Sequence, residues 1–186
     1  MRTAALALTF IAWTMAPAGA GDAVSVDIVE HGIYMAEITS TVRDPNGIQR
    51  NVLANICHVA TTRTVPAKYG LHFGFRFRVN GGETGQLVNL KKAVVFPTVM
   101  TLPGLAKPLT MYDYAFSART GLTSYTGYSF DHAWEFVPGT WTFQILQRER
   151  KLAELRFTVV DGTDMFVPPA GNANCFRISA GHGWSP

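Results

Sequence analysis

The run from Thr123 to Phe136 holds the densest group of side chains that could do chemistry. Ser129, Asp131 and His132 lie within it, and these are the residue types of a hydrolytic triad. Alternating residue types predict a strand over Tyr125–Phe136, in which neighbouring side chains point to opposite faces. Asp131 and His132 would then diverge, and the Gly-x-Ser-x-Gly turn of many serine hydrolases is absent. We therefore expect no catalytic residue and no enzyme, although a β-bulge that realigned the pair would reopen the hydrolase alternative.

The predicted strand divides its side chains into two rows. The apolar row holds Tyr128, Phe130, His132, Trp134 and Phe136, and the other row holds Tyr125, Ser129, Asp131 and Glu135. His132 is expected to be a hydrogen-bonded core neighbour of Trp134. Tyrosine and tryptophan are favoured at interfaces, so the candidate recognition residues are Tyr125, Tyr128, Asp131, His132 and Trp134. The alternative is that these rings belong to the core.

Histidine, cysteine and methionine are possible metal ligands, and secreted copper proteins use them. The chain has five histidines, but no two lie within five residues of each other, and no Cys-x-x-Cys is present. We expect no metal site and no cofactor. If a metal site exists, the region of Cys175 and His182 is its best location.

Composition limits the possible partners. The 186 residues carry a formal charge of +3, and only 16% of them are charged. The mean hydropathy of +0.10 comes from the first twenty residues. Without them the charge falls to about +2, which argues against electrostatic capture of nucleic acid.

The first twenty residues have the pattern of a secretory signal peptide. Met1 and Arg2 precede an apolar run over Ala4–Met15, and small residues follow up to Ala20. An uncleaved anchor is the alternative, but twelve helical residues reach about 18 Å, well short of a hydrocarbon core of about 30 Å. We expect cleavage after Ala20, no transmembrane segment in the mature chain, and a secreted, periplasmic protein.

Two cysteines remain in the mature chain, Cys57 and Cys175. An even count in a secreted chain favours a disulfide, and buried thiols are the alternative. The bond would close a loop of roughly 118 residues, worth about 4 to 5 kcal/mol in the chain-entropy account.

Strand signals dominate the rest of the sequence. Leu71 to Val79 alternates apolar and polar residues without error, which predicts one core face and one basic, solvated face. Trp141–Ile145 and Ala153–Val159 read as a hairpin joined at Gln147–Lys151. The other expected strands are 24–29, 33–42, 51–62, 86–96 and 125–136, with a loop over 97–108. The pattern predicts an all-β, antiparallel, immunoglobulin-like sandwich of seven to eight strands over 21–160, with a Gly- and Pro-rich tail over 161–186 tethered by the disulfide.

Several motifs resemble those of an uncharacterised family of secreted bacterial domains, domain-of-unknown-function family 3859. They are Gly32-Ile33-Tyr34, Phe73-Gly74-Phe75, and the segment from Tyr125-Thr-Gly-Tyr128 to Pro138-Gly-Thr-Trp141, followed by 151–159. The resemblance covers about 32–160. It implies a β-sandwich behind a signal peptide, and it assigns no activity, cofactor or catalytic residue.

The sequence therefore predicts a non-catalytic binding module of the cell envelope, with an envelope protein as the expected partner. The alternative is a binder of a small molecule or carbohydrate that uses Tyr125 or the loop over 97–108. A deep pocket lined by aromatic residues would favour that alternative.

Overall fold

The structure is a computed structural model that describes residues 24–43, 48–101 and 107–162, and the backbone of 174–176. The predicted signal peptide, most of the predicted tail and His182 lie outside the described residues. No helix among the described residues is long and apolar enough to cross a membrane.

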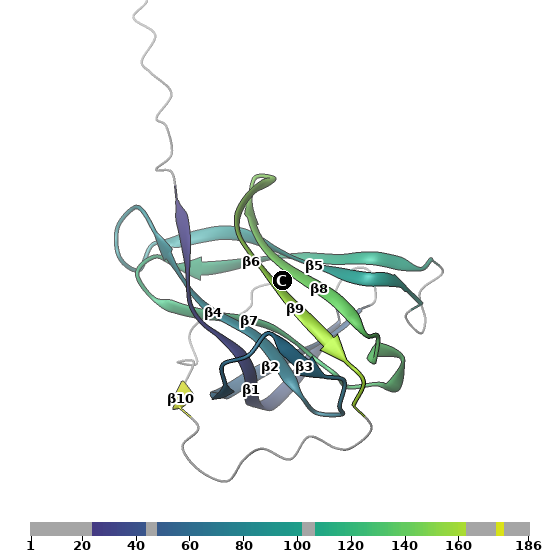
Figure 1. The fold of residues 1–186 in the computed structure, drawn as a ribbon. Helices are drawn as coiled ribbons and strands as arrows, with labels where there is room; N and C mark the ends of the chain where they lie inside the picture. The colour runs from purple at the N-terminus through teal and green to yellow at the C-terminus, as the bar shows by residue number, and fades with distance from the viewer. Residues whose placement is uncertain (1–23, 44–47, 102–106, 163–173, 177–186) are drawn as a thin grey trace, which may run out of the picture.

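Two five-stranded sheets face each other in the described residues (Figure 1). The first sheet, in spatial order, contains β10 (Asn174–Phe176), β2 (Gln49–Ala60), β1 (Ser25–Arg43), β4 (His72–Asn80) and β7 (Thr123–Ser129). The second contains β3 (Thr64–Pro66), β9 (Arg150–Val160), β8 (Gly139–Gln147), β5 (Leu87–Met100) and β6 (Leu109–Arg119). One 3-10 turn, η1 (Ala133–Glu135), follows β7. The predicted all-β, immunoglobulin-like sandwich is confirmed, with β6 and β7 as edge strands.

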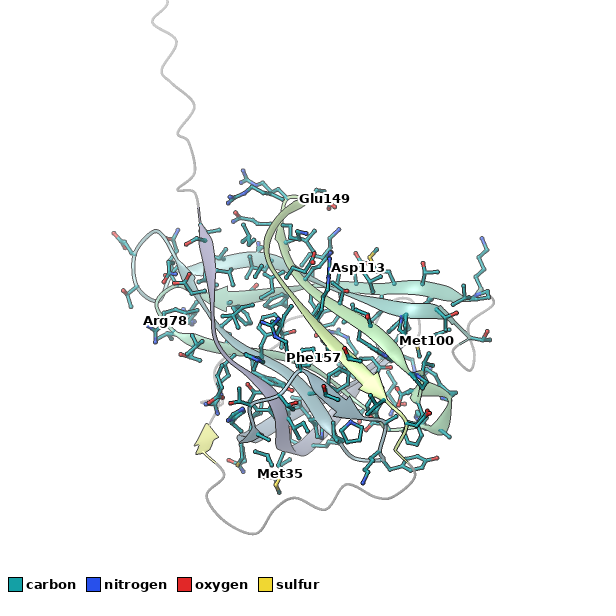
Figure 2. The ribbon with its side chains drawn as sticks, viewed as in Figure 1. Met35, Arg78, Met100, Asp113, Glu149 and Phe157 are labelled. Carbon is teal, nitrogen blue, oxygen red and sulfur yellow. The ribbon has the colours of Figure 1, made fainter. Side chains whose placement is uncertain are left out.

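The core lies between the sheets. The apolar face of β4, which the alternation in its sequence predicts, points into this core. Phe73, Phe75 and Phe77 are fully buried, as are Trp141 and Phe157 from the opposite sheet. Figure 2 shows Phe157 lying in this interior. Phe73 meets the ring of Phe157 edge to face at 5.4 Å, a geometry that aromatic pairs favour. Each such side chain contributes roughly 1.5 to 3 kcal/mol through burial.

The hairpin of β8 and β9 confirms the predicted link. Gln147 pairs with Arg150 across a two-residue turn, in which Arg148 and Glu149 both have positive φ. Two positive φ values match the twist of the flanking strands.

Two expected strands form one long strand, β1, which changes partner near its middle. Its first half pairs with β4 and its second half pairs with β2. Gly32 lies at the change with φ +141°, and a Cβ there would come within 1.9 Å of the Ala60 carbonyl oxygen. Only glycine allows this close approach, at the point where the pairing of β1 passes from β4 to β2.

The sequence prediction omitted β3 and β6. β6 alternates Tyr112, Tyr114 and Phe116 with Asp113 and other residues that point outward, so it carries a strand signal. The predicted loop over 97–108 is shorter than expected, because β5 continues to Met100. Residues 102–106 lie outside the described residues.

Candidate functional site

A cavity of about 800 Å³ lies beside the two edge strands. Its wall comes from β7 and η1, from β5 and β6 of the opposite sheet, and from the β1–β2 hairpin. All five candidate recognition residues line it: Tyr125, Tyr128, Asp131, His132 and Trp134. The structure therefore brings together side chains that the strand prediction had placed in two opposite rows.

The two predicted rows are right within β7, where Tyr125 and Tyr128 lie on opposite faces. They are wrong beyond Ser129, because β7 ends there and the chain then turns through η1. Glu135, predicted on the outer row, is buried, with 6% of its surface exposed. His132, predicted as a core residue, is exposed, yet its ring does stack on Trp134 at 5.8 Å. The prediction was right about this neighbour and wrong about burial.

The carboxylates of this segment are held by donors from the protein itself. Glu135 accepts hydrogen bonds from the Tyr128 hydroxyl at 2.8 Å and from the backbone N–H groups of Asp131 and His132 at 2.5 and 2.7 Å. Burial raises the pKa of Glu135. Asp131 accepts from Asn51 Nδ2 at 2.7 Å and from Ser129 Oγ at 2.9 Å. Ser129 and Asp131 thus hold η1 and the hairpin in place.

Sequence reasoning missed the most unusual side chain of the cavity, Lys92. It is 5% exposed, and its Nζ donates to the Gly127 carbonyl oxygen. The Nζ also lies 5.4 Å from the ring centroid of Tyr114 and 5.6 Å from that of Phe143. Burial, and then the charge of Arg50, lowers the pKa of Lys92 to about 7. The alternation of Leu90, Lys92 and Val94 in β5 was the signal that Lys92 points inward.

Arg50 brings a second positive charge to the cavity from the β1–β2 hairpin. Its guanidinium lies 4.4 Å from the ring centroid of Tyr114, the same ring that Lys92 faces. Burial raises the pKa of Tyr114 to about 12, so its hydroxyl stays protonated at neutral pH. Cation and ring face each other in an arrangement worth about 0.5 to 2 kcal/mol.

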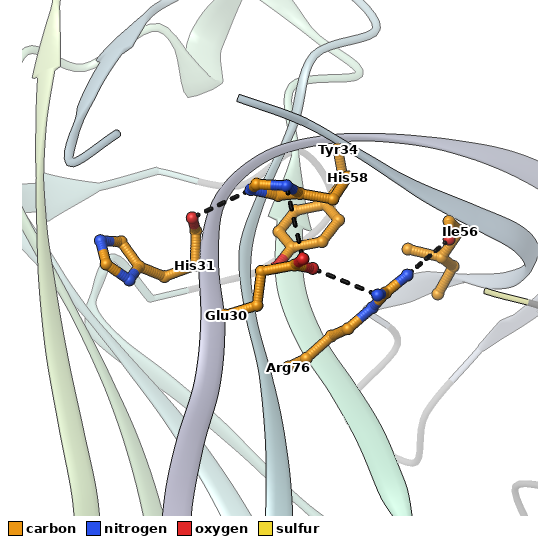
Figure 3. A network of polar contacts seen from close by, with 6 residues as sticks. All are labelled: Glu30, His31, Tyr34, Ile56, His58 and Arg76. Carbon is orange, nitrogen blue, oxygen red and sulfur yellow. Dashed lines mark hydrogen bonds and ion pairs between the residues drawn. The ribbon is translucent and has the colours of Figure 1, made fainter. Parts of the chain in front are cut away.

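A second polar cluster lies under the hairpin, on the outer face of β4 (Figure 3). Glu30 contacts Arg76 Nη1 at 3.2 Å and His58 Nδ1 at 3.4 Å, and it accepts from the Tyr34 hydroxyl at 3.3 Å. Arg76 Nη2 donates to the Ile56 carbonyl oxygen at 3.1 Å. The Tyr34 ring lies 4.8 Å from that of Tyr125, at an angle of 65°, which connects this cluster with the cavity wall.

This cluster corrects the prediction that the polar face of β4 is solvated. Only Arg78 of that row is exposed, whereas His72 and Arg76 are 5% and 7% exposed. Burial lowers the pKa of His72, so the ring is neutral at pH 7. The residues that contact Arg76 come from β1 and β2, and the alternation of β4 alone could not reveal these contacts.

The two cysteine positions lie opposite each other. β10 pairs with β2 so that Cys175 is the register partner of Cys57, and directly opposed strand positions are close enough for a disulfide. Among the described residues, no group of three or more His, Cys, Asp or Glu side chains could hold a metal ion.

Comparisons with known proteins agree with this fold. An immunoglobulin-like protein from Pseudomonas aeruginosa matches with a TM-score of 0.53 and 25% sequence identity, over 76% of this chain and 100% of that one. The comparison with curated proteins finds no match. The profile of the family "Domain of unknown function (DUF3859)" matches residues 23–159. Since this match covers most of the chain, the chain belongs to the DUF3859 family.

Proposed function

We propose that this protein is a secreted, non-catalytic binding module that takes a small organic ligand into the cavity between its edge strands. The observation that carries this proposal is the cavity itself. Its volume of about 800 Å³ falls within the range of roughly 300 to 1,000 Å³ that is usual for small-molecule sites. Its wall also has the composition of such sites, because aromatic rings surround a few polar groups.

The rings on the cavity wall come from both sheets. Tyr128 and Trp134 belong to the β7 side, while Phe96, Tyr112 and Tyr114 belong to β5 and β6. Trp141 is fully buried and remains a core residue. This distribution favours the small-ligand alternative over the envelope protein expected from the sequence, since the aromatic residues line a concave site.

Secretion, a periplasmic location and a disulfide between Cys57 and Cys175 belong to the same proposal. They rest on the leader sequence and on the opposed positions of the two cysteines. The mass of the unreduced secreted protein tests two of them together. It should correspond to a chain that begins after Ala20 and has lost two hydrogens, and two alkylatable thiols would contradict the disulfide.

Binding of a neutral, solvatochromic dye such as Nile red tests use of the cavity. The wild-type protein should enhance the dye's fluorescence and shift it to the blue. Val52→Trp, on the hairpin side of the cavity wall, should fill the space and weaken binding at least ten-fold. The matched control is Val29→Trp, because Val29 is 53% exposed and does not line the cavity. Absence of dye binding, or equal binding by both variants, would contradict the proposed function.

A further inference from the structure

The cavity contains a buried positive charge that the described residues do not neutralise. Lys92 is buried, with 5% of its surface exposed. Its ammonium group donates to a neutral acceptor, the backbone carbonyl of Gly127. Burial and the charge of Arg50 both lower the pKa of Lys92, and no carboxylate among the described residues acts in the opposite direction. A buried ammonium without a counter-ion is costly, so the site favours any anion that can reach it.

The acids on the cavity wall already have other partners. Glu135 is bound by Tyr128 and two backbone N–H groups, and Asp131 is bound by Asn51 and Ser129. Among the described residues, neither carboxylate contacts Lys92, whose acceptor is the Gly127 carbonyl oxygen. The cavity thus has a cationic part at Lys92 and Arg50. It also has a separate part at Asp131 and Glu135, whose carboxylates are hydrogen-bonded by donors of the protein itself.

A second observation also indicates a ligand. The Thr126 side chain is 5% exposed and lines the cavity, and its hydroxyl has no hydrogen-bond partner. The hydroxyl of Tyr125, also on the wall, is buried without a partner as well. Buried polar groups without partners are rare in native proteins. A hydroxyl can donate to an anionic oxygen, so an anion bound at Lys92 would satisfy the ammonium charge and the Thr126 hydroxyl, which lies on the same inner side of β7.

We propose that the ligand is a small amphipathic organic anion, with a carboxylate as its simplest charged group, which binds with that group at Lys92 and its apolar body against the cavity rings. This inference rests on the proposed function, because it names the chemistry of the ligand in the same cavity. Thr126 donates to the anion, and Arg50 adds a positive potential from the hairpin. Phe96 and Tyr112 contact the apolar body.

Two matched ligand pairs test the charge requirement. The first pair is 1-naphthylacetic acid and 1-naphthylacetamide, and the second is decanoic acid and decanol. Affinities are measured at pH 6.5 by calorimetry and by displacement of Nile red. The wild-type protein should bind at least one acid ten-fold or more tightly than its neutral analogue. Equal affinities within both pairs, or no binding of either acid, would overturn the inference.

Lys92→Met locates the charge effect. It should lower the affinity for the acid at least ten-fold and leave the affinity for the neutral analogue within about two-fold. The matched control is Lys91→Met, because Lys91 lies next to Lys92 but points outward, where it pairs with Asp113 and Glu149. Unchanged acid binding in Lys92→Met would also overturn the inference.

The two proposals fail in different ways. If Nile red binds to the cavity but acids show no preference over their neutral analogues, the proposed function stands and the anion is wrong. If Nile red and all four ligands fail to bind, the proposed function is wrong as well. Thermal melting of each variant verifies that it folds, and replacement of a buried cation by an apolar side chain of similar length should not prevent folding.

Discussion

Two buried basic residues, Arg76 and Lys92, occupy opposite sides of the first sheet and differ in what surrounds them. Arg76, on the outer face, contacts the carboxylate of Glu30 and the carbonyl of Ile56. Lys92, in the interior, has the carbonyl of Gly127 and two aromatic rings, beside a cavity. Arg76 therefore holds the hairpin on the sheet, whereas Lys92 adds a positive charge to a space that a ligand can enter.

The difference shows how a buried charge can be interpreted. A buried cation that meets a carboxylate of its own chain is a structural element, and its loss affects folding. A buried cation without such a carboxylate is a cost to folding, and a binding site is one reason for a protein to keep it. Breaking the ion pair of Arg76 should therefore lower stability, whereas removing the charge of Lys92 should raise it.

Glu30→Gln should have the largest effect. It removes the carboxylate that contacts Arg76 and His58. It should lower the free energy of unfolding by about 3 kcal/mol, since breaking this partly buried ion pair takes a carboxylate away from the buried Arg76 guanidinium. Urea unfolding at pH 7 measures the change. Asp27→Asn is the control, because Asp27 accepts one hydrogen bond from Asn80 at an exposed position. A loss of less than 1 kcal/mol would mean that the cluster does not hold the hairpin.

Lys92→Met should instead raise the free energy of unfolding, by about 2 kcal/mol at pH 7, because the buried charge is replaced by an apolar side chain. In the wild-type protein, the pKa of Lys92 is lowered to about 7, well below its value in the unfolded chain. The unfolded state then binds more protons above pH 7, so stability rises with pH, by up to about 1.4 kcal/mol per unit.

Urea unfolding at pH 7, 8 and 9 measures this slope. The rise with pH should be present in the wild-type protein and in Lys91→Met, and it should be absent in Lys92→Met. Tyrosines of the unfolded chain begin to ionise near pH 10, so the comparison ends at pH 9. If Lys92→Met destabilises the protein, the lysine has a structural role like that of Arg76.

Tyr128→Phe should have a smaller effect on the free energy of unfolding. It tests whether the carboxylate part of the cavity, at Glu135, acts independently of the cationic part at Lys92. It removes the donor at 2.8 Å from buried Glu135 and should cost about 1 to 3 kcal/mol, because a hydrogen bond to a charged group is lost. With that donor gone, the pKa of Glu135 should rise further. Acid binding at Lys92 should change by less than three-fold, and a ten-fold loss would show that the two parts act as one.

The sequence was most informative where local alternation decides the structure, and least informative where distant segments meet. The alternation of β4 predicts that Phe73, Phe75 and Phe77 form the core, and they do. It also predicts a solvated polar row, which is wrong because residues of β1 and β2 cover Arg76. Such coverage is a tertiary contact that no local pattern contains.

The candidate site shows the same division. The five candidate recognition residues were predicted as a cluster of residue types, and the structure places all five on one cavity. The predicted opposite faces are right for Tyr125 and Tyr128 in β7. They are wrong beyond Ser129, because the strand ends there and the chain then turns through η1. Lys92 was missed although its inward direction follows from β5, because a charged residue in an apolar row is easily taken as an exception to the pattern.

Thr126→Val should have the smallest effect on stability and therefore isolates the ligand. Its hydroxyl has no partner, and valine has nearly the same shape, so the free energy of unfolding should stay within about 1 kcal/mol of wild type or rise. If the hydroxyl donates to a bound anion, affinity for the acid should fall about three- to ten-fold, the equivalent of one hydrogen bond, while the neutral analogue binds unchanged. If the variant loses stability but keeps full affinity for the acid, Thr126 has a structural role, as Arg76 has. Lys92 would then be the group that attracts the anion without help from Thr126.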